Sequence, residues 1–499
     1  MCGVVAAAAP TLPAQALDAE AEDAFDAAVF LLERATTPRR DGTHHRLLRA
    51  LRHLQDPALG PLYRHLAESS HPGLKIHGLL GLGETSPEGR LDVHHLLRLE
   101  EPALQAELVS SALDDDLITL DDCEQVLSWR DLDAGVRLVL ATRLMGASRF
   151  EDAALLKSML EEDAAPGRRG MAAALLTQLG DPAGVRALRE LSASDQPHRE
   201  AVEITLLRAA LAHELDALGP WAFDVALSDE GSQARRLMAL RVALRFGAEG
   251  AEALWRSRFA RADDPVQRLR LALTLLHLSP HLEPAVFETL EAAEEPLLRQ
   301  AGRTGRAIAS SDASTLDRVY ELMLFRRGLV NAWAIDFAET HARPDEGQVI
   351  LLGMLQTAAE TENEADRAEL LATAAEATRA LFELDPLVAS RLLRPYLSGP
   401  EVDPGLAQAI LLGLVRAGVP EAGQVVADLP LLPNPDAAAL QVLLRAKHGL
   451  ELDRRQARML RTIVRGGGAM QETLRIQAAW ALLKRMNRVS PALARIVRG

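Results

Sequence analysis

Several residue types are scarce in this sequence of 499 residues, and each scarcity excludes a class of protein. Two cysteines, Cys2 and Cys123, are too few for a disulfide framework or a cysteine zinc site. Aromatic residues make up 4% of the chain, which is little for a β-sandwich or barrel, whose strands are rich in Tyr, Phe and Trp. No apolar run reaches the roughly 18 residues of a membrane-spanning helix, so we expect no transmembrane segment. Lysine is also rare, with four residues against 51 arginines, a bias typical of a bacterial GC-rich genome.

The composition that remains is that of a large folded protein. Apolar residues account for 48% of the chain and charged residues for 25%, which excludes disorder over most of the length. The net charge of −15 argues against a surface coated in nucleic acid, because phosphate contacts require an excess of Lys and Arg.

The dominant pattern is a repeat of about 31 to 35 residues. Each repeat contains two segments of roughly 10 to 16 residues in which Leu, Ala, Val and Ile recur at i, i+3, i+4 and i+7. Pro opens many of these segments, and Gly or a polar residue closes them, as in 182–191 followed by 201–212. Because one helix pair cannot bury its apolar face alone, neighbouring pairs must stack. The sequence therefore predicts an all-α protein, an α-solenoid of about thirteen antiparallel helix pairs.

The regularity of the repeat changes along the chain and suggests a division. Residues 17–310 form the regular part of the expected solenoid, residues 311–448 a more divergent continuation with longer helices, and residues 449–499 a basic helical cap. Residues 1–16 are either a signal peptide or a disordered leader, because Ala14-Gln15-Ala16 has the small-x-small form of a cleavage site but no basic residue precedes it. Export to the periplasm after cleavage behind Ala16 is slightly favoured, with a cytoplasmic location as the alternative.

The repeat resembles HEAT repeats over about residues 40–310, particularly the short HEAT-like form of phycobilisome lyases. The best matches are 56–84, 150–181 and 248–278. In the first of them, Asp56-Pro57 opens a helix, Pro72 and Lys75 form a Pro-x-x-Lys start of the second helix, and Gly83 follows its last apolar residue. The resemblance implies a curved armadillo-like superhelix that holds protein partners. Bilin lyases and HEAT-like alkylpurine DNA glycosylases imply an alternative, an enzyme or a nucleic-acid-binding protein on the same scaffold.

A basic residue recurs near the start of the second helix of each repeat. We expect these residues to pair with acids in the preceding turn of the same or an adjacent repeat and so form a structural ladder; the alternative is a groove for an anionic partner. The candidate acids are Asp131, Asp163, Asp195, Asp229, Asp264 and Glu295. The basic residues are Lys75, Arg137, Arg168, Arg199, Arg235, Arg268 and Arg299.

Catalytic motifs do not occur. There is no Gly-Lys pair for a P-loop, no Gly-x-Ser-x-Gly elbow, and His213-Glu214 lacks the second His of a zinc protease. We therefore predict no catalytic residue, no cofactor and no metal, and a protein that is not an enzyme.

Histidine is the one potential ligand that clusters. Stacked repeats could bring His65 near His94 or His95, but no pair has the i, i+4 spacing of a helical metal site, so we favour ordinary surface or turn histidines. Eight of the fourteen histidines lie within 52 residues: His44, His45, His53, His65, His71, His77, His94 and His95.

The C-terminal end is strongly basic. Residues 440–499 contain 13 Lys and Arg and three acids, a net charge of +10, so the rest of the chain carries −25. In the helix predicted over 452–465, four arginines at i, i+4, i+7 and i+11 form one stripe. Like charges this close repel, so an opposite charge must offset them. The repulsion is offset either by the acidic remainder of the chain or by solvent, or else by an external anion such as an acidic protein, a membrane surface or nucleic acid. The candidate anion-binding or partner-binding residues are Arg454, Arg458, Arg461, Arg465, Arg475, Lys484, Arg485 and Arg488.

Two acidic stretches complement this end. Residues 18–26 carry five acids and no base, and residues 339–385 carry 11 acids and three arginines. Either is a solvated face or meets the basic end of another copy head to tail.

Together these observations predict a non-catalytic scaffold for protein–protein interaction, with the basic C-terminal patch as its docking surface. The expected partner is a protein, and an acidic protein or anionic surface suits the patch. Nucleic acid is disfavoured by the net charge.

Overall fold

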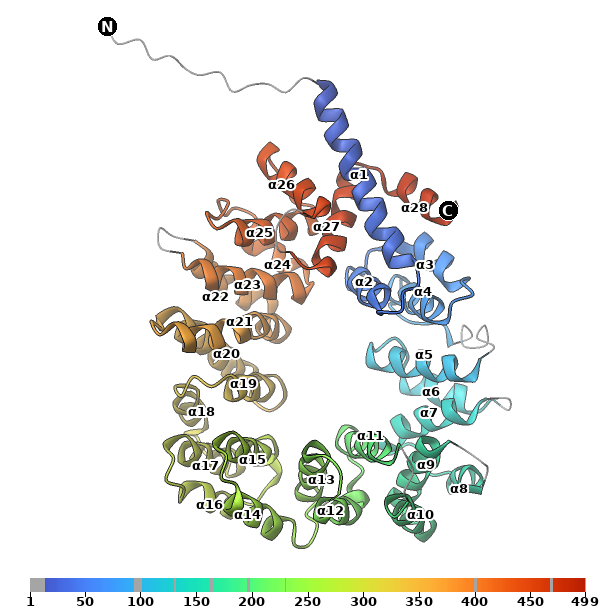
Figure 1. Cartoon of the computed structure of the whole chain (residues 1–499), viewed down its shortest axis with the longest axis vertical. Coiled ribbons are helices and arrows are strands. Elements are labelled where there is room, and N and C mark those ends of the chain that lie inside the picture. The colour runs from blue at the N-terminus through green and yellow to red at the C-terminus, as the bar shows by residue number, and fades with distance from the viewer. Residues whose placement is uncertain are drawn as a thin grey trace. The chain divides into compact units, whose positions relative to one another are not determined.

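The computed structural model describes residues 14–93, 101–129, 132–161, 165–194, 198–228, 230–398, 402–466 and 470–498 (Figure 1). Within these ranges the chain is all helical and contains no β-strand. No described helix is long and apolar enough to cross a membrane. Of the predicted leader, residues 1–13 lie outside the described ranges, and Ala14–Ala16 form the first residues of a helix.

Local sequence accounts for where many helices begin. Asp181, Asp264, Asp385 and Asp403 each precede a proline, and each carboxylate accepts a backbone N–H two or three residues further on. The proline occupies the first helical position, where a missing N–H costs nothing. The Asp-Pro pairs seen in the sequence are therefore N-caps. As a result, observed bounds agree closely with predicted ones, as for Pro182–Ser192 against the expected 182–191.

The described chain consists of two compact units, residues 1–89 with 374–499 (unit 1) and residues 90–373 (unit 2). Helix α21 (Glu364–Leu384) contains one of the two boundaries. The helices of unit 1 are α1 (Ala14–Thr36), α2 (Thr43–Arg52), α3 (Gly60–Ala67), α4 (Pro72–Glu84), α22 (Pro386–Leu397), α23 (Pro404–Ala417), α24 (Pro420–Val426), α25 (Pro435–Lys447), α26 (Arg454–Arg465), α27 (Glu472–Arg485) and α28 (Val489–Arg498), with the 3₁₀ helix η1 (Pro57–Leu59).

The helices of unit 2 follow one another without interruption by another unit. They are α5 (Pro102–Asp114), α6 (Leu120–Leu127), α7 (Ala134–Gly146), α8 (Ala153–Glu161), α9 (Pro166–Gln178), α10 (Pro182–Ser192), α11 (Arg199–Ala212), α12 (Gly219–Leu227), α13 (Gln233–Arg245), α14 (Ala251–Arg261), α15 (Pro265–Leu278), α16 (Glu288–Glu291), α17 (Pro296–Ala309), α18 (Thr315–Met323), α19 (Gly328–Thr340) and α20 (Pro344–Glu360), with the 3₁₀ helices η3 (Asp216–Leu218), η4 (Ser279–His281) and η5 (Pro284–Phe287).

In unit 2, helices pair into hairpins and the hairpins pack in series. Helix α9 packs on α10, and α13 packs on α12. One helix of each hairpin continues the series, so that α5, α7, α9, α11, α13, α15 and α17 each contact the next. The apolar side chains between them are buried, with Leu140, Leu176, Leu207 and Leu240 fully or almost fully covered.

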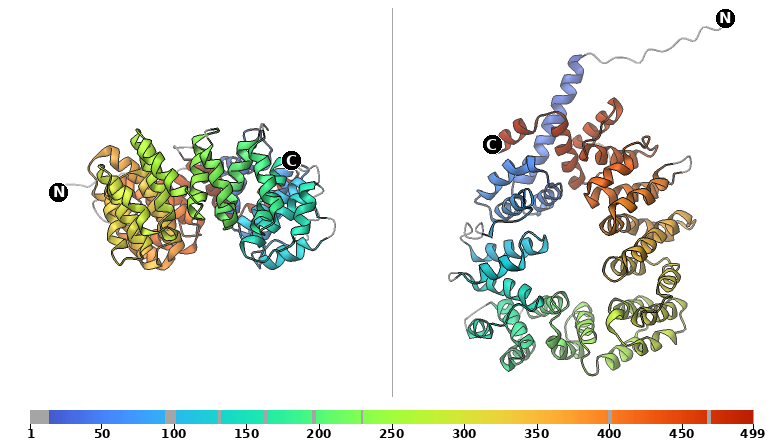
Figure 2. Two further views of the ribbon diagram at one scale, coloured as in Figure 1. Left: turned by 90° about the horizontal axis from the view of Figure 1, so that it is seen from below. Right: turned by 180° about the vertical axis from the view of Figure 1, so that it is seen from behind.

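In unit 1, the two ends of the chain pack together. Helix α1 contacts α26, α27 and α28, and α2 contacts α27 (Figure 2). Gln477 of α27 donates to the Ala50 carbonyl of α2 at 3.0 Å. Because the N-terminal helices share a core with the C-terminal ones, the units divide near residues 89 and 373. The divisions expected after residues 310 and 448 do not coincide with these boundaries.

Three polar bonds between neighbouring hairpins share one spacing. Arg52 pairs with Glu84, Arg235 with Glu203, and the Lys447 ammonium donates to the Val415 carbonyl, each over 32 residues of sequence. Residues at equivalent places in consecutive hairpins lie one repeat apart, so this separation agrees with the expected repeat length.

Candidate functional site

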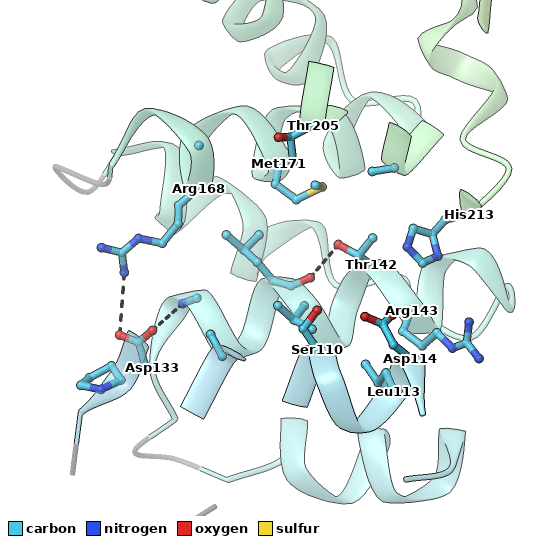
Figure 3. Close-up of a pocket in the computed structure, with 17 residues that line it drawn as sticks. Ser110, Leu113, Asp114, Asp133, Thr142, Arg143, Arg168, Met171, Thr205 and His213 are labelled. Carbon is cyan, nitrogen blue, oxygen red and sulfur yellow. Dashed lines mark hydrogen bonds and ion pairs between the residues drawn. The ribbon is translucent and has the colours of Figure 1, made fainter. Parts of the chain in front are cut away.

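A cavity of about 840 Å³ lies along the helices α5, α7, α9 and α11 of unit 2 (Figure 3). Its floor is apolar: Leu113 and Leu138 are buried in it, and Val139 and Met171 are half-buried. Its rim is solvent-exposed, with Ser110, Asp114, Arg143, Arg168 and Thr205 among the rim residues. We call it the α5–α11 groove. A concave, mostly apolar surface with a few polar groups is typical of a binding site.

Three ionisable side chains gather at one end of the groove. Asp114 is the last residue of α5, Arg143 lies in the last turn of α7, and His213 comes directly after α11. Figure 3 places these three side chains around the same end. Burial lowers the pKa of His213, the Arg143 charge lowers it further, and Asp114 acts in the opposite direction. His213 is therefore neutral near pH 7, and Arg143 is the cation of this end.

The backbone at this end is shaped by one glycine. A Cβ atom at Gly146 would lie 3.2 Å from the Cβ of His213, closer than side chains normally pack. Glycine therefore lets the end of α7 approach the end of α11, which brings Arg143 and His213 to one place.

The other end of the groove is held by the N-terminus of α7. Asp133 caps this helix by accepting the Gly135 N–H at 2.7 Å, and its second oxygen lies 3.8 Å from the Arg168 guanidinium of α9 (Figure 3). The carboxylate is thus a structural cap and a link between adjacent hairpins. Between the two ends, the Thr142 hydroxyl donates to the Leu138 carbonyl of its own helix at 2.7 Å, which leaves the floor largely apolar.

Half of the predicted basic stripe at the C-terminus, and one further residue of the predicted patch, pair with acids of α1. Arg461 is 3.6 Å from Glu20, Arg465 is 2.8 Å from Asp23, and Arg488 forms an ion pair with Glu22. Outside the predicted set, Arg495 is 2.7 Å from Asp26. The acids of 18–26 therefore meet the basic end of the same chain, which favours the interpretation that the acidic remainder offsets the stripe.

The rest of the predicted patch is divided between other partners. Arg475 donates to the carbonyls of Ile463 and Val464 at the end of α26. Lys484 is 2.7 Å from Asp56, and Arg485 donates to the Leu450 carbonyl at 2.8 Å. Arg454 and Arg458 are exposed and have no ion pair among the described residues.

The predicted ladder residues contact several kinds of acceptor. Arg235 pairs with Glu203 and Arg268 with Glu295, and these pairs join adjacent hairpins. Arg199 pairs with Glu230. Of these three carboxylates, Glu295 is one of the predicted acids, whereas Glu203 and Glu230 are not.

Other ladder positions use no carboxylate from the predicted set. Arg137 donates to the carbonyls of Leu132 and Trp129. Of the candidate acids, Asp264 caps the N-terminus of α15. Lys75 and Arg299 have no ion pair among the described residues, and the remaining candidate acids, Asp131, Asp163, Asp195 and Asp229, lie outside the described ranges.

Four of the clustered histidines meet in unit 1. His45 Nδ1 lies 3.1 Å from His77 Nε2, and the His44 ring is 4.0 Å from that of His45 and 5.6 Å from that of His71. Burial lowers the pKa of His44, and burial together with the nearby positive charge of Arg52 lowers the pKa of His77 to about 3. His53 and His65 are not part of this group, and His94 and His95 lie outside the described residues. Within the described ranges, no three His, Cys, Asp or Glu side chains are arranged to hold a metal.

Of the groove residues, Arg168 was among the predicted site residues, as a member of the ladder, and the others were not. Val139, Met171 and Thr205 come from three successive hairpins and are 32 and 34 positions apart, so only the repeat length relates them. Comparing equivalent positions of consecutive repeats, rather than looking for a local motif, would have found them. Comparison with known proteins adds no assignment: no family model matches this sequence, and no curated protein matches it.

Proposed function

We propose that this protein is a HEAT-like α-solenoid scaffold that binds a segment of a partner protein in the α5–α11 groove. The single observation that carries the proposal is the groove itself, an apolar floor with an exposed polar rim that runs over one helix from each of four successive hairpins. The contacts between hairpins over 32 residues support the solenoid. Helices pack about 8–10 Å apart, so four of them span roughly 25–30 Å, the length of an extended segment of about eight residues.

The chemistry of the rim suggests the character of the segment. Arg143 is exposed at one end and has no ion pair within the described chain, while the floor offers Leu113, Leu138, Val139 and Met171. The proposed occupant therefore has apolar side chains followed by an acidic residue that pairs with Arg143. The basic stripe on α26 is a poorer docking surface than we expected, because Arg461 and Arg465 already pair with α1.

The test uses the full-length protein with a photo-crosslinking amino acid at Val139 or Thr205. The control proteins carry the crosslinking amino acid at Val185 on α10 or at Thr462 on α26. Thr462 matches Thr205, because both are exposed helical threonines whose hydroxyls donate to the carbonyl four residues earlier. We expect adducts with one protein segment from the groove positions only. A synthetic peptide of that segment should bind the wild type and bind Arg143→Glu at least tenfold more weakly. Adducts from all four positions, or only a small apolar molecule found by native mass spectrometry, would contradict the proposal.

A further inference from the structure

A second cavity, of about 370 Å³, lies in unit 1 where the two ends of the chain meet. Leu54 and Asp56 supply one wall from the N-terminal side. The other walls come from the turn between α23 and α24, the end of α25 and one face of α27, including Lys447, Gln477 and Arg485. Its lining is more polar than that of the α5–α11 groove and is independent of it.

The lining of this cavity has more cations than carboxylates. Asp56 is its one acidic residue, and it is fully engaged: it accepts from Lys484 Nζ at 2.7 Å, from Trp480 Nε1 at 2.9 Å and from the Ala58 N–H at 3.0 Å. This carboxylate balances Lys484. Lys447 and Arg485 then contribute two positive charges without a carboxylate of the lining to balance them.

Lys447 and Arg485 are bonded to neutral groups. The Lys447 ammonium donates to the Val415 carbonyl at 2.9 Å, and Arg485 donates to the Leu450 carbonyl at 2.8 Å. Neither has an ion pair among the described residues. An ammonium has three donors and a guanidinium has five, so both have donors to spare. Burial alone lowers the pKa of Lys447 to about 8, so it stays mostly charged near pH 7. Holding a charge away from water is costly unless a counter-charge accompanies it, and this cost applies to the half-buried Lys447, since Arg485 is exposed.

Gln477, which lines the cavity, has a buried acceptor that lacks a donor. Gln477 is 7% exposed, and its amide nitrogen donates to the Ala50 carbonyl, but its Oε1 has no hydrogen-bond partner among the described groups. A buried acceptor of this kind costs free energy until a donor reaches it. His448, beside Lys447, is kept neutral because burial lowers its pKa to about 4, with a further lowering from Lys447 and an opposing effect of Glu421.

We propose that this cavity binds a phosphate monoanion or dianion, free or as a small phosphate monoester. The phosphoryl oxygens would accept from Lys447 and Arg485. A protonated phosphate oxygen, or a hydroxyl on the organic part of a monoester, would donate to Gln477 Oε1 once the amide turns toward the cavity. An oxyanion without an O–H group would pair with the two cations but could not donate a hydrogen bond to the Gln477 amide oxygen. Because the walls come from both ends of the chain, the bound anion would also stabilise their association.

The experiment measures thermal unfolding and calorimetric binding of the full-length protein at pH 7 and constant ionic strength, with sodium phosphate, sodium sulfate and sodium chloride. We expect saturable stabilisation by phosphate, weaker stabilisation by sulfate, and none by chloride. Arg485→Gln should weaken phosphate binding about tenfold or more, the usual effect of losing one charged hydrogen bond. The matched control Arg454→Gln, on the exposed face of α26, should leave binding unchanged.

A second variant, which leaves the charge of the cavity unchanged, tests the hydrogen bond that distinguishes phosphate from sulfate. Gln477→Leu should reduce the preference for phosphate over sulfate while it keeps sulfate binding. Glycerol 3-phosphate and a phosphoserine peptide then separate a small monoester from a protein-borne one, since a cavity of this size favours the former. Equal effects of the three salts on the wild type, or unchanged phosphate binding by Arg485→Gln and Lys447→Met together, would overturn the proposal.

Discussion

The buried ion pair between Arg235 and Glu203 gives the sharpest test of how the hairpins are joined. Arg235 is 2% exposed and Glu203 is 0% exposed, and Nε of the arginine lies 2.5 Å from Oε2 of the glutamate. The guanidinium also donates to the Glu230 carbonyl at 2.7 Å. We expect Arg235→Met to be strongly destabilising, because it leaves the Glu203 carboxylate buried without a counter-charge.

The magnitude follows from the burial. Removing one partner of a buried pair costs about 3–5 kcal/mol of unfolding free energy. Unfolding entropy is about 2.1 cal/mol/K per residue, so for a cooperative unit of residues 90–373 it is about 0.6 kcal/mol/K. Arg235→Met should therefore lower the unfolding temperature of the transition that includes α11 and α13 by about 5–8 °C. Circular dichroism measures the shift, and hydrogen exchange shows whether α11 and α13 lose protection first.

The double variant Glu203→Leu/Arg235→Met should be close to the wild type in stability. Oε1 of Glu203 has no partner among the described groups, so the pair is not fully compensated and apolar side chains of similar volume replace it at little cost. The control is Arg256→Met, which removes an exposed i, i+4 pair with Glu252 and should cost less than about 0.5 kcal/mol. A cost below 1 kcal/mol for Arg235→Met, or a double variant as unstable as the two single variants summed, would refute the reasoning.

Three further predictions concern other parts of the molecule. The pKa of His77 is about 3 in the folded protein and about 6.5 in the unfolded chain, so its contribution to the free energy of unfolding is complete above pH 6.5 and is lost as the pH falls toward 3. At pH 5 the loss is about 2 kcal/mol. Chemical denaturation of the wild type and of His77→Gln at several pH values measures this loss. Gly305→Ala should cost about 1–3 kcal/mol, because a Cβ there would lie 2.1 Å from a phenylalanine ring, whereas Gly167→Ala, with nothing within 4 Å, should be neutral or stabilising in the same melts. Arg488→Glu should increase hydrogen exchange of α1 by placing like charge opposite Glu22, and added salt should reduce the difference from wild type.

The helices and their starts were predictable from the sequence because their causes are local. Asp-Pro pairs cap helices, and apolar residues at helical spacing identify the buried face, so α10 begins and ends close to where expected. The all-α prediction was confirmed for the same reason. Glycine positions such as Gly146, which brings the ends of α7 and α11 together, were not identified, because their role depends on a residue 67 positions away.

The sequence indicated which segments carry complementary charges, but not whether those segments pair within one chain. The sequence contained the acidic stretch 18–26 and the basic end after residue 440, and an interaction between them in head-to-tail copies was one expectation. The structure brings them together within one chain, as in Arg465 with Asp23. Composition identifies complementary charges but not whether they belong to one molecule, because that depends on how the intervening helices turn. The groove escaped prediction for a related reason, since each of its helices contributes only a few unremarkable residues.

The packing of the first helices against the last ones has a consequence for biosynthesis. Helices α1 and α2 leave the ribosome first, yet their contacts with α27 must wait until about 420 further residues have been synthesised, roughly 20–80 s at ordinary rates of translation. During that interval the apolar face of α1, including Leu31 and Leu32, lacks its final cover. The early chain therefore depends on transient protection, and a product released before α26 is made would lack the contacts of α1 and α2 with the C-terminal helices, although α1 to α4 could still pack on one another.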